Sequence, residues 1–135
     1  LQRALDTFRE LGISKSVVVG GYKADRLILP EWSELVMNHQ YMSNNILHSL
    51  ACARGEMEPI GTVLVSYSDI VFQNGVAEGL MSAQSADISI VVDQAWAERY
   101  EGRMLHPIAE AEAAHFDDEG RLRTKIGRAS WRERV

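Results

Sequence analysis

Three polar side chains follow apolar stretches of the chain: Asn38 and Asp93 come directly after them, and Asp69 comes after Ser66-Tyr67-Ser68. The stretch before Asp69 contains Thr62–Val65, a mostly β-branched run typical of a strand buried on both faces. The carboxyl ends of parallel strands share one edge of a sheet, and open α/β sheets bind ligands there. Carboxylate and amide oxygens at that edge suit phosphate and magnesium chemistry, so Asp69 is our first candidate functional residue. An acid in this position also occurs as a helix cap or in a solvated turn.

Helical and strand patterns alternate along the chain, which predicts an α/β fold with a mostly parallel sheet and helices on both faces. Apolar periodicity predicts helices over residues 1–11, 23–29, 44–57 and 74–84, and strands over residues 17–19, 34–38, 62–65 and 87–93. Ser43 or Asn44 can cap the third helix, whose N-terminus would then offer free N–H groups to a phosphate. Asn44 and Asn45 can equally serve only to cap the helix and turn the chain.

The remaining segments are read as turns and a hairpin. Gly20-Gly21 permits a tight turn or the close approach of another backbone, but two glycines do not make a phosphate loop. After Asp93 we expect a short helix and a loop, in which His106 neighbours Arg103. Residues 113–124 have the pattern of a β-hairpin with its turn at 117–120.

Bulk properties narrow the class of protein. The 135 residues allow one domain, and the formal net charge of −5 argues against binding to nucleic acid. No apolar run approaches the roughly 20 residues of a membrane span, and no signal segment opens the chain, so we expect a cytoplasmic protein that is not bound to membranes. The single cysteine, Cys52, lies in an apolar helical stretch and is interpreted as a core residue.

Both ends of the chain are unusual. It opens at Leu1 inside an amphipathic pattern, which suggests that an N-terminal part is missing. Residues 126–135 resemble the translation of a sequencing adapter, so we interpret them as a non-native tail and residues 1–125 as a partial domain.

Four stretches in a fixed order carry a family resemblance: Val17–Tyr22, then Asn38–Ile46 with Ser49-Leu50, then Tyr67–Phe72, then Val92-Asp93 with Trp96. In these stretches, which span residues 1 to about 112, the chain resembles the nucleotidyltransferase superfamily. The likeness is to its phosphocholine and 2-aminoethylphosphonate cytidylyltransferase branch. The resemblance implies a Rossmann-like three-layer sandwich, incomplete at both ends of this chain.

The implied reaction is the Mg²⁺-dependent transfer of CMP from CTP to a small phosphate or phosphonate acceptor, with release of pyrophosphate. By this likeness Asp69 is the catalytic metal ligand, and the nucleotide and acceptor site is lined by Asn38, Asn44, Ser49 and Asp93. Trp96 and Tyr100 would face a cationic amine of the acceptor, since aromatic faces attract cations. Trp96 can alternatively belong to the core or an interface. An anionic acceptor requires alignment and charge neutralisation rather than a general base.

This sequence also departs from the family pattern. The family's glycine-rich triphosphate loop would precede Leu1, and a second metal-binding acid would follow the point where the tail begins. We therefore expect the fragment to be inactive although its parent is an enzyme. A sugar-1-phosphate nucleotidyltransferase and a non-catalytic nucleotide-binding module remain as alternatives.

Overall fold

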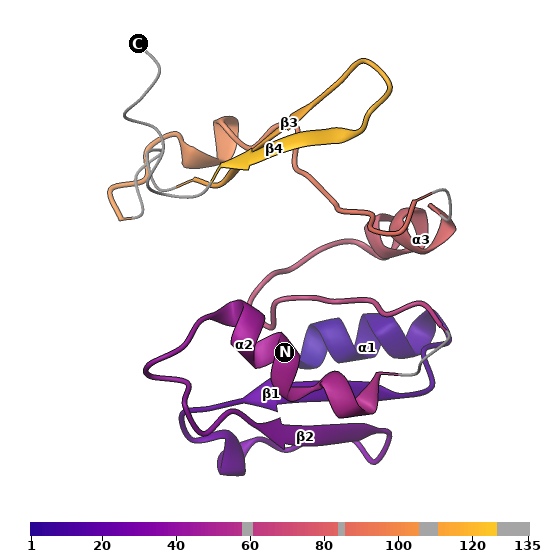
Figure 1. Ribbon diagram of the computed structural model, residues 1–135, viewed down its shortest axis with the longest axis vertical. Coiled ribbons are helices and arrows are strands. Elements are labelled where there is room, and N and C mark those ends of the chain that lie inside the picture. The colour runs from indigo at the N-terminus through magenta and orange to yellow at the C-terminus, as the bar shows by residue number, and fades with distance from the viewer. Residues whose placement is uncertain (58–60, 84–85, 106–110, 127–135) are drawn as a thin grey trace. The chain divides into compact units, whose positions relative to one another are not determined.

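The computed structural model describes residues 1–57, 61–83, 86–105 and 111–126 (Figure 1). The chain forms two compact units, Leu1–Asp87 and Ile88–Val135, called here the first and the second unit. The described part combines helices with short strands, as the alternating pattern predicts. No helix within it is both long and apolar enough to cross a membrane.

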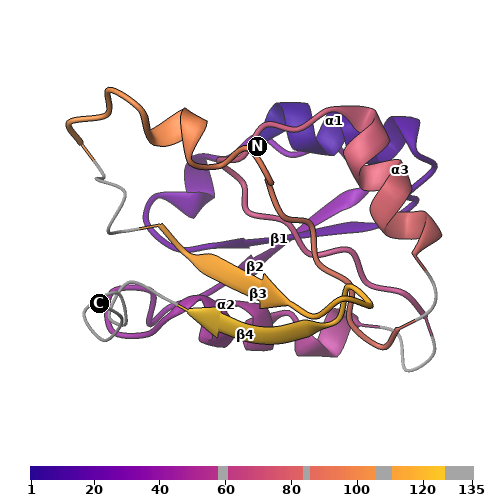
Figure 2. The same ribbon diagram turned by 90° about the horizontal axis from the view of Figure 1, so that it is seen from above.

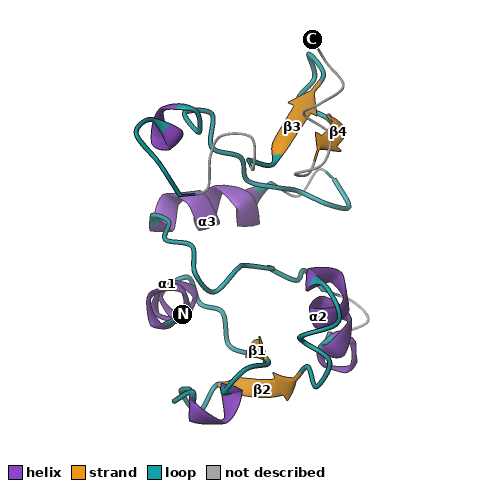
Figure 3. Ribbon diagram, turned by 90° about the vertical axis from the view of Figure 1, so that its left-hand side faces the viewer, coloured by secondary structure: helices purple, strands orange, loops and turns teal. Residues whose placement is uncertain are grey.

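The first unit is built on a two-strand parallel sheet. Its elements in chain order are α1 (Gln2–Glu10), β1 (Ser16–Gly20), the 3₁₀ helix η1 (Ala24–Arg26), β2 (Ser33–Met37), α2 (Ile46–Cys52), the 3₁₀ helix η2 (Arg54–Glu56) and α3 (Asn74–Ser82). β1 and β2 pair in parallel, from Ser16 opposite Ser33 to Gly20 opposite Met37. Figures 2 and 3 show α1 on one side of this strand pair and α2 on the other. This arrangement is compatible with an α/β fold, because parallel strands are covered on both faces.

The amphipathic pattern at the start of the chain forms α1, as predicted. Leu5 on its apolar stripe is only 2% exposed. Phe8 on the same helix packs against Phe72, with 5.9 Å between the ring centroids. Asn74 at the start of α3 donates a hydrogen bond of 2.7 Å to Glu10. These contacts fasten α1 to the segment that leads into α3.

Two of the four predicted strands are not formed. Residues 62–65 and 87–93 are described, and neither segment is a strand. Val63 and Val65 are 49% and 60% exposed, and Ile88 is 83% exposed. The predictions were wrong because an apolar run indicates a preference for burial but supplies no neighbour for the backbone N–H and C=O groups of a strand. The helix predicted over residues 23–29 is likewise reduced to the three residues of η1.

The second unit contains the 3₁₀ helix η3 (Glu98–Tyr100) and the predicted hairpin, formed by β3 (Ala113–Phe116) and β4 (Leu122–Ile126). The two strands are antiparallel, with a register irregularity between His115 and Phe116. The turn closes with a hydrogen bond of 2.9 Å from Gly120 N to Asp117 O, and Gly120 has the left-handed φ of 75° that glycine favours. The hairpin prediction is confirmed. Ile126, the first residue of the proposed tail, ends β4, and residues 127–135 lie outside the described part.

Candidate functional site

Three of the predicted site residues meet at the carboxyl end of β2. The Asn38 side-chain amide donates hydrogen bonds of 3.0 Å each to Asn44 Oδ1 and Ser49 Oγ. Asn44 returns a hydrogen bond of 3.0 Å to Asn38 Oδ1. Asn38 is 3% exposed, whereas Asn44 and Ser49 are half-buried. The cluster joins the end of β2 to the loop before α2 and to α2 itself.

The hydrogen-bonding capacity of the Asn38 side chain is fully used. Its amide group has two N–H donors, which serve Asn44 and Ser49, and its oxygen accepts from Asn44 and from the Gln40 backbone N–H at 3.0 Å. Its own backbone N–H donates to Gly20 O at 2.8 Å. Asn38 therefore orients its neighbours and has no group left for a ligand. Within the described residues, no hydrogen bond uses the second amide proton of Asn44 or the hydroxyl proton of Ser49, so both can serve a ligand.

Of the capping residues considered from the sequence, neither Ser43 nor Asn44 caps α2, and Asn45 does. The N-cap residue is Asn45, whose side-chain oxygen accepts a hydrogen bond of 3.2 Å from His48 N. Asn44 does not cap the helix because its side chain is bound to Asn38. α2 has seven residues, and Asn45 already uses one of the free N–H groups of its first turn. The site therefore depends on the side chains of Asn44 and Ser49 rather than on the helix N-terminus.

Asp69 lies in a turn in the first unit and is exposed. It does not end a strand, since residues 62–65 form none. The preceding carbonyl, Ser68 O, accepts a hydrogen bond of 2.7 Å from the amino group of Leu1. Within the described residues, no hydrogen bond or ion pair engages the Asp69 carboxylate, which leaves it available to a cation.

The described side chains offer few ligands for a magnesium ion. No group of three or more His, Cys, Asp or Glu side chains in the described ranges could hold a metal ion. Mg²⁺ bound to a nucleotide needs only one or two protein carboxylates, because water and phosphate oxygens complete its coordination. Asp69 fits that limited role.

The other predicted residues form a cluster of their own in the second unit. Asp93 is paired with Arg99 through its carboxylate and the Arg99 Nε. Trp96 and Tyr100 pack edge to face, with 6.0 Å between centroids and an angle of 75°. The Arg103 guanidinium lies 4.9 Å from the centroid of the Tyr100 ring. The roles of Arg99 and Arg103 were not predicted from the sequence. The only local signal is spacing, since each arginine lies three residues after one of the two aromatic residues. His106 lies outside the described residues.

The pKa shifts in the described residues arise at ion pairs elsewhere in the fold. Lys15 Nζ lies 2.9 Å from Glu56 and 3.5 Å from Glu34. The hydrogen bond with Glu56 raises the pKa of Lys15, and the same bond lowers the pKa of Glu56. In the hairpin turn, the backbone N–H of Arg121 donates to Asp117 at 2.7 Å and lowers the pKa of that carboxyl group. These groups link elements of the fold and lie apart in sequence from the candidate site residues.

Comparisons with protein-family models, with curated proteins and with solved structures find no match to this chain.

Proposed function

We propose that the parent of this chain is a cytoplasmic, Mg²⁺-dependent nucleotidyltransferase that moves CMP from CTP to a small phosphorylated or phosphonate amine or alcohol, releasing pyrophosphate. A Rossmann-like three-layer sandwich is part of this proposal. The observation that carries it is the cluster of Asn38, Asn44 and Ser49 at the carboxyl end of β2. The sequence resemblance named these three residues, and in the fold Asn38 is hydrogen-bonded to both Asn44 and Ser49.

The cluster supports nucleotide binding through its remaining donors. One amide proton of Asn44 and the hydroxyl proton of Ser49 are available to phosphate or sugar oxygens. Both residues are half-buried, so hydrogen bonds to a bound anion would be partly shielded from water. Because Asn38 is buried and fully bonded, these donors are held in place before a ligand arrives.

The proposed reaction needs few groups from the protein. An anionic oxygen of the acceptor attacks the α-phosphorus of CTP, and the bond from that phosphorus to the pyrophosphate oxygen breaks. The chain contributes alignment through Asn44 and Ser49 and a negative charge for a cation through Asp69. Mg²⁺, when bound, would offset the charge that develops on the phosphate oxygens.

The resemblance assigns Trp96 and Tyr100 to the cationic group of the acceptor, and both residues belong to the second unit. Trp96 and Tyr100 present aromatic rings, and Asp93, whose carboxylate is paired with Arg99, lies in the same short segment. The position of Arg103 over the Tyr100 ring supports the capacity of that ring to bind a cation. An amine or trimethylammonium group is the chemistry that such a cluster would recognise.

Binding is tested first by NMR titration of the ¹⁵N-labelled chain with CTP, with and without Mg²⁺. We expect the side-chain amide signals of Asn38 and Asn44 to move on titration. Asp69→Asn should weaken the Mg²⁺-dependent part of binding about tenfold, or ~1.4 kcal/mol, because it removes the carboxylate charge from an exposed position. Asp87→Asn, a second exposed acid of the first unit, is the matched control and should bind like the unaltered chain. Unmoved amide signals, or equal effects of the two variants, would contradict this assignment.

Turnover is tested on the parent protein by measuring pyrophosphate release from CTP and Mg²⁺. The acceptors to compare are 2-aminoethylphosphonate, phosphocholine and a hexose 1-phosphate. Release with an amine-bearing acceptor supports the proposal. Release with the hexose phosphate alone would identify a sugar-1-phosphate nucleotidyltransferase, and binding without release would identify a non-catalytic nucleotide-binding module.

A further inference from the structure

The loop that carries Asn44 is held at two places. At its base, Asn38 binds the loop through Gln40 N, Tyr41 N and the Asn44 side chain. Within the loop, Asn44 N donates to Gln40 O at 3.1 Å. Farther out, the Tyr41 ring lies against the backbone of Gly21, directly after β1. The contact between Tyr41 and Gly21 involves none of the nucleotide-site residues Asn38, Asn44 and Ser49.

The contact at Gly21 leaves no room for a side chain. A Cβ atom at Gly21 would lie 2.5 Å from Tyr41 Cγ, 2.6 Å from Tyr41 Cβ and 2.9 Å from Tyr41 Cδ1. Two of these atoms are at the root of the tyrosine side chain, so rotation of the ring alone cannot relieve the overlap. The Tyr41 backbone, and with it the loop, would have to move.

Steric space is the reason for glycine at this position. Gly21 is not among the residues with positive φ, so its backbone conformation is open to an alanine. Tyr22 packs on the same tyrosine, with 6.5 Å between the ring centroids of Tyr22 and Tyr41. Gly20 has a different neighbour, since a Cβ atom there would lie 2.5 Å from Ala24 Cβ in η1. A Cβ atom at Gly21 therefore meets Tyr41 first, whereas one at Gly20 meets Ala24 first.

We propose that Gly21 and Tyr41 are positioning residues for the nucleotide site, because their contact sets the loop at the place where the Asn44 amide reaches Asn38. The role in nucleotide binding rests on the proposed function. The effect of Gly21 and Tyr41 on the Asn38–Asn44 hydrogen bonds does not depend on the proposed function. The hydrogen bonds and nucleotide binding can therefore be tested separately.

The test compares four variants of the full chain by NMR. Gly21→Ala introduces the overlap, and Tyr41→Ala removes the ring without adding any atom. Tyr41→Phe keeps the ring, and Gly79→Ala adds a methyl group on α3, where nothing lies within 4 Å of the new Cβ. We expect Gly21→Ala and Tyr41→Ala to lose the through-space signal between the Asn38 and Asn44 side-chain amides, and Tyr41→Phe and Gly79→Ala to retain it. CTP affinity should fall roughly tenfold or more in the first two variants, as one or two hydrogen bonds are lost.

Backbone amide signals of β1 and β2 report whether the first unit is still folded. If Gly21→Ala unfolds it, Tyr41→Ala decides, since that variant creates no overlap. An unchanged Asn38–Asn44 signal in Tyr41→Ala would overturn the positioning role. If the unaltered chain does not bind CTP, the proposed function fails, and the amide signals still decide whether Gly21 and Tyr41 position Asn44.

Discussion

Replacing Asn38 with alanine should lower the stability of the first unit by more than the loss of one hydrogen bond would. The substitution removes four side-chain hydrogen bonds, two given by the amide group and two accepted by its oxygen. Each is worth about 1 kcal/mol net in a folded protein. Water can partly replace those to the half-buried Asn44 and Ser49, so we expect a total loss of about 2–4 kcal/mol.

Native-state hydrogen exchange of the β1 amides measures this loss in the first unit alone. Val18 lies in the middle of β1 and is 9% exposed, so its amide reports opening of the β1–β2 pair. A loss of 2–4 kcal/mol corresponds to exchange that is roughly 30-fold to 900-fold faster.

The matched control is Asn45→Ala in the same loop. It removes one capping bond and should cost about 1 kcal/mol. If Asn38→Ala accelerates Val18 exchange no more than Asn45→Ala does, the buried amide network does not hold the end of β2, and the reasoning fails.

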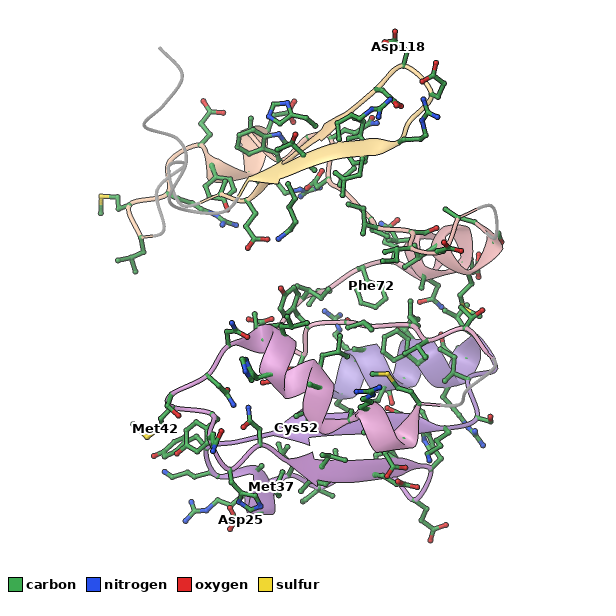
Figure 4. All side chains as sticks on the ribbon, in the orientation of Figure 1. Asp25, Met37, Met42, Cys52, Phe72 and Asp118 are labelled. Carbon is green, nitrogen blue, oxygen red and sulfur yellow. The ribbon has the colours of Figure 1, made fainter. Side chains whose placement is uncertain are left out.

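Two further predictions concern the ion pairs. Lys15→Met should lower the stability of the first unit at neutral pH, because pairing lowers the pKa of Glu56 and raises that of Lys15. In urea unfolding, the difference should shrink as the pH falls through the lowered pKa of Glu56, because the protonated carboxyl group no longer pairs with Lys15. A pH-independent difference would contradict this assignment. Asp117→Ala should abolish the cross-strand NMR contacts of β3 and β4, since Asp117 accepts from Arg121 N. The exposed Asp118, labelled in Figure 4, is the control, and equal effects of Asp117→Ala and Asp118→Ala would refute the role of the turn.

Local sequence patterns predicted well those elements whose stability is mainly local. α1, β1, β2 and the hairpin occur where periodicity and turn residues placed them. The hairpin strands are neighbours in the chain, and β1 and β2 each have the other as a backbone partner. The same reasoning failed for residues 62–65 and 87–93. Their apolar residues have the composition of buried strands, but a strand is formed only when another backbone lies beside it.

For the site, the sequence by itself determined which residue types could bind a phosphate or a cation, and it named Asn38, Asn44, Ser49 and Asp69. Tertiary structure alone decided how they are used. Asn38 is buried and bonded at every polar atom, Asn45 rather than Asn44 caps α2, and Asp69 stands in an exposed turn. The physical reason is that burial and the choice of hydrogen-bond partners depend on how the loop between β2 and α2 folds back onto Asn38 and onto the end of β1. Spacing along the sequence does not specify those partners.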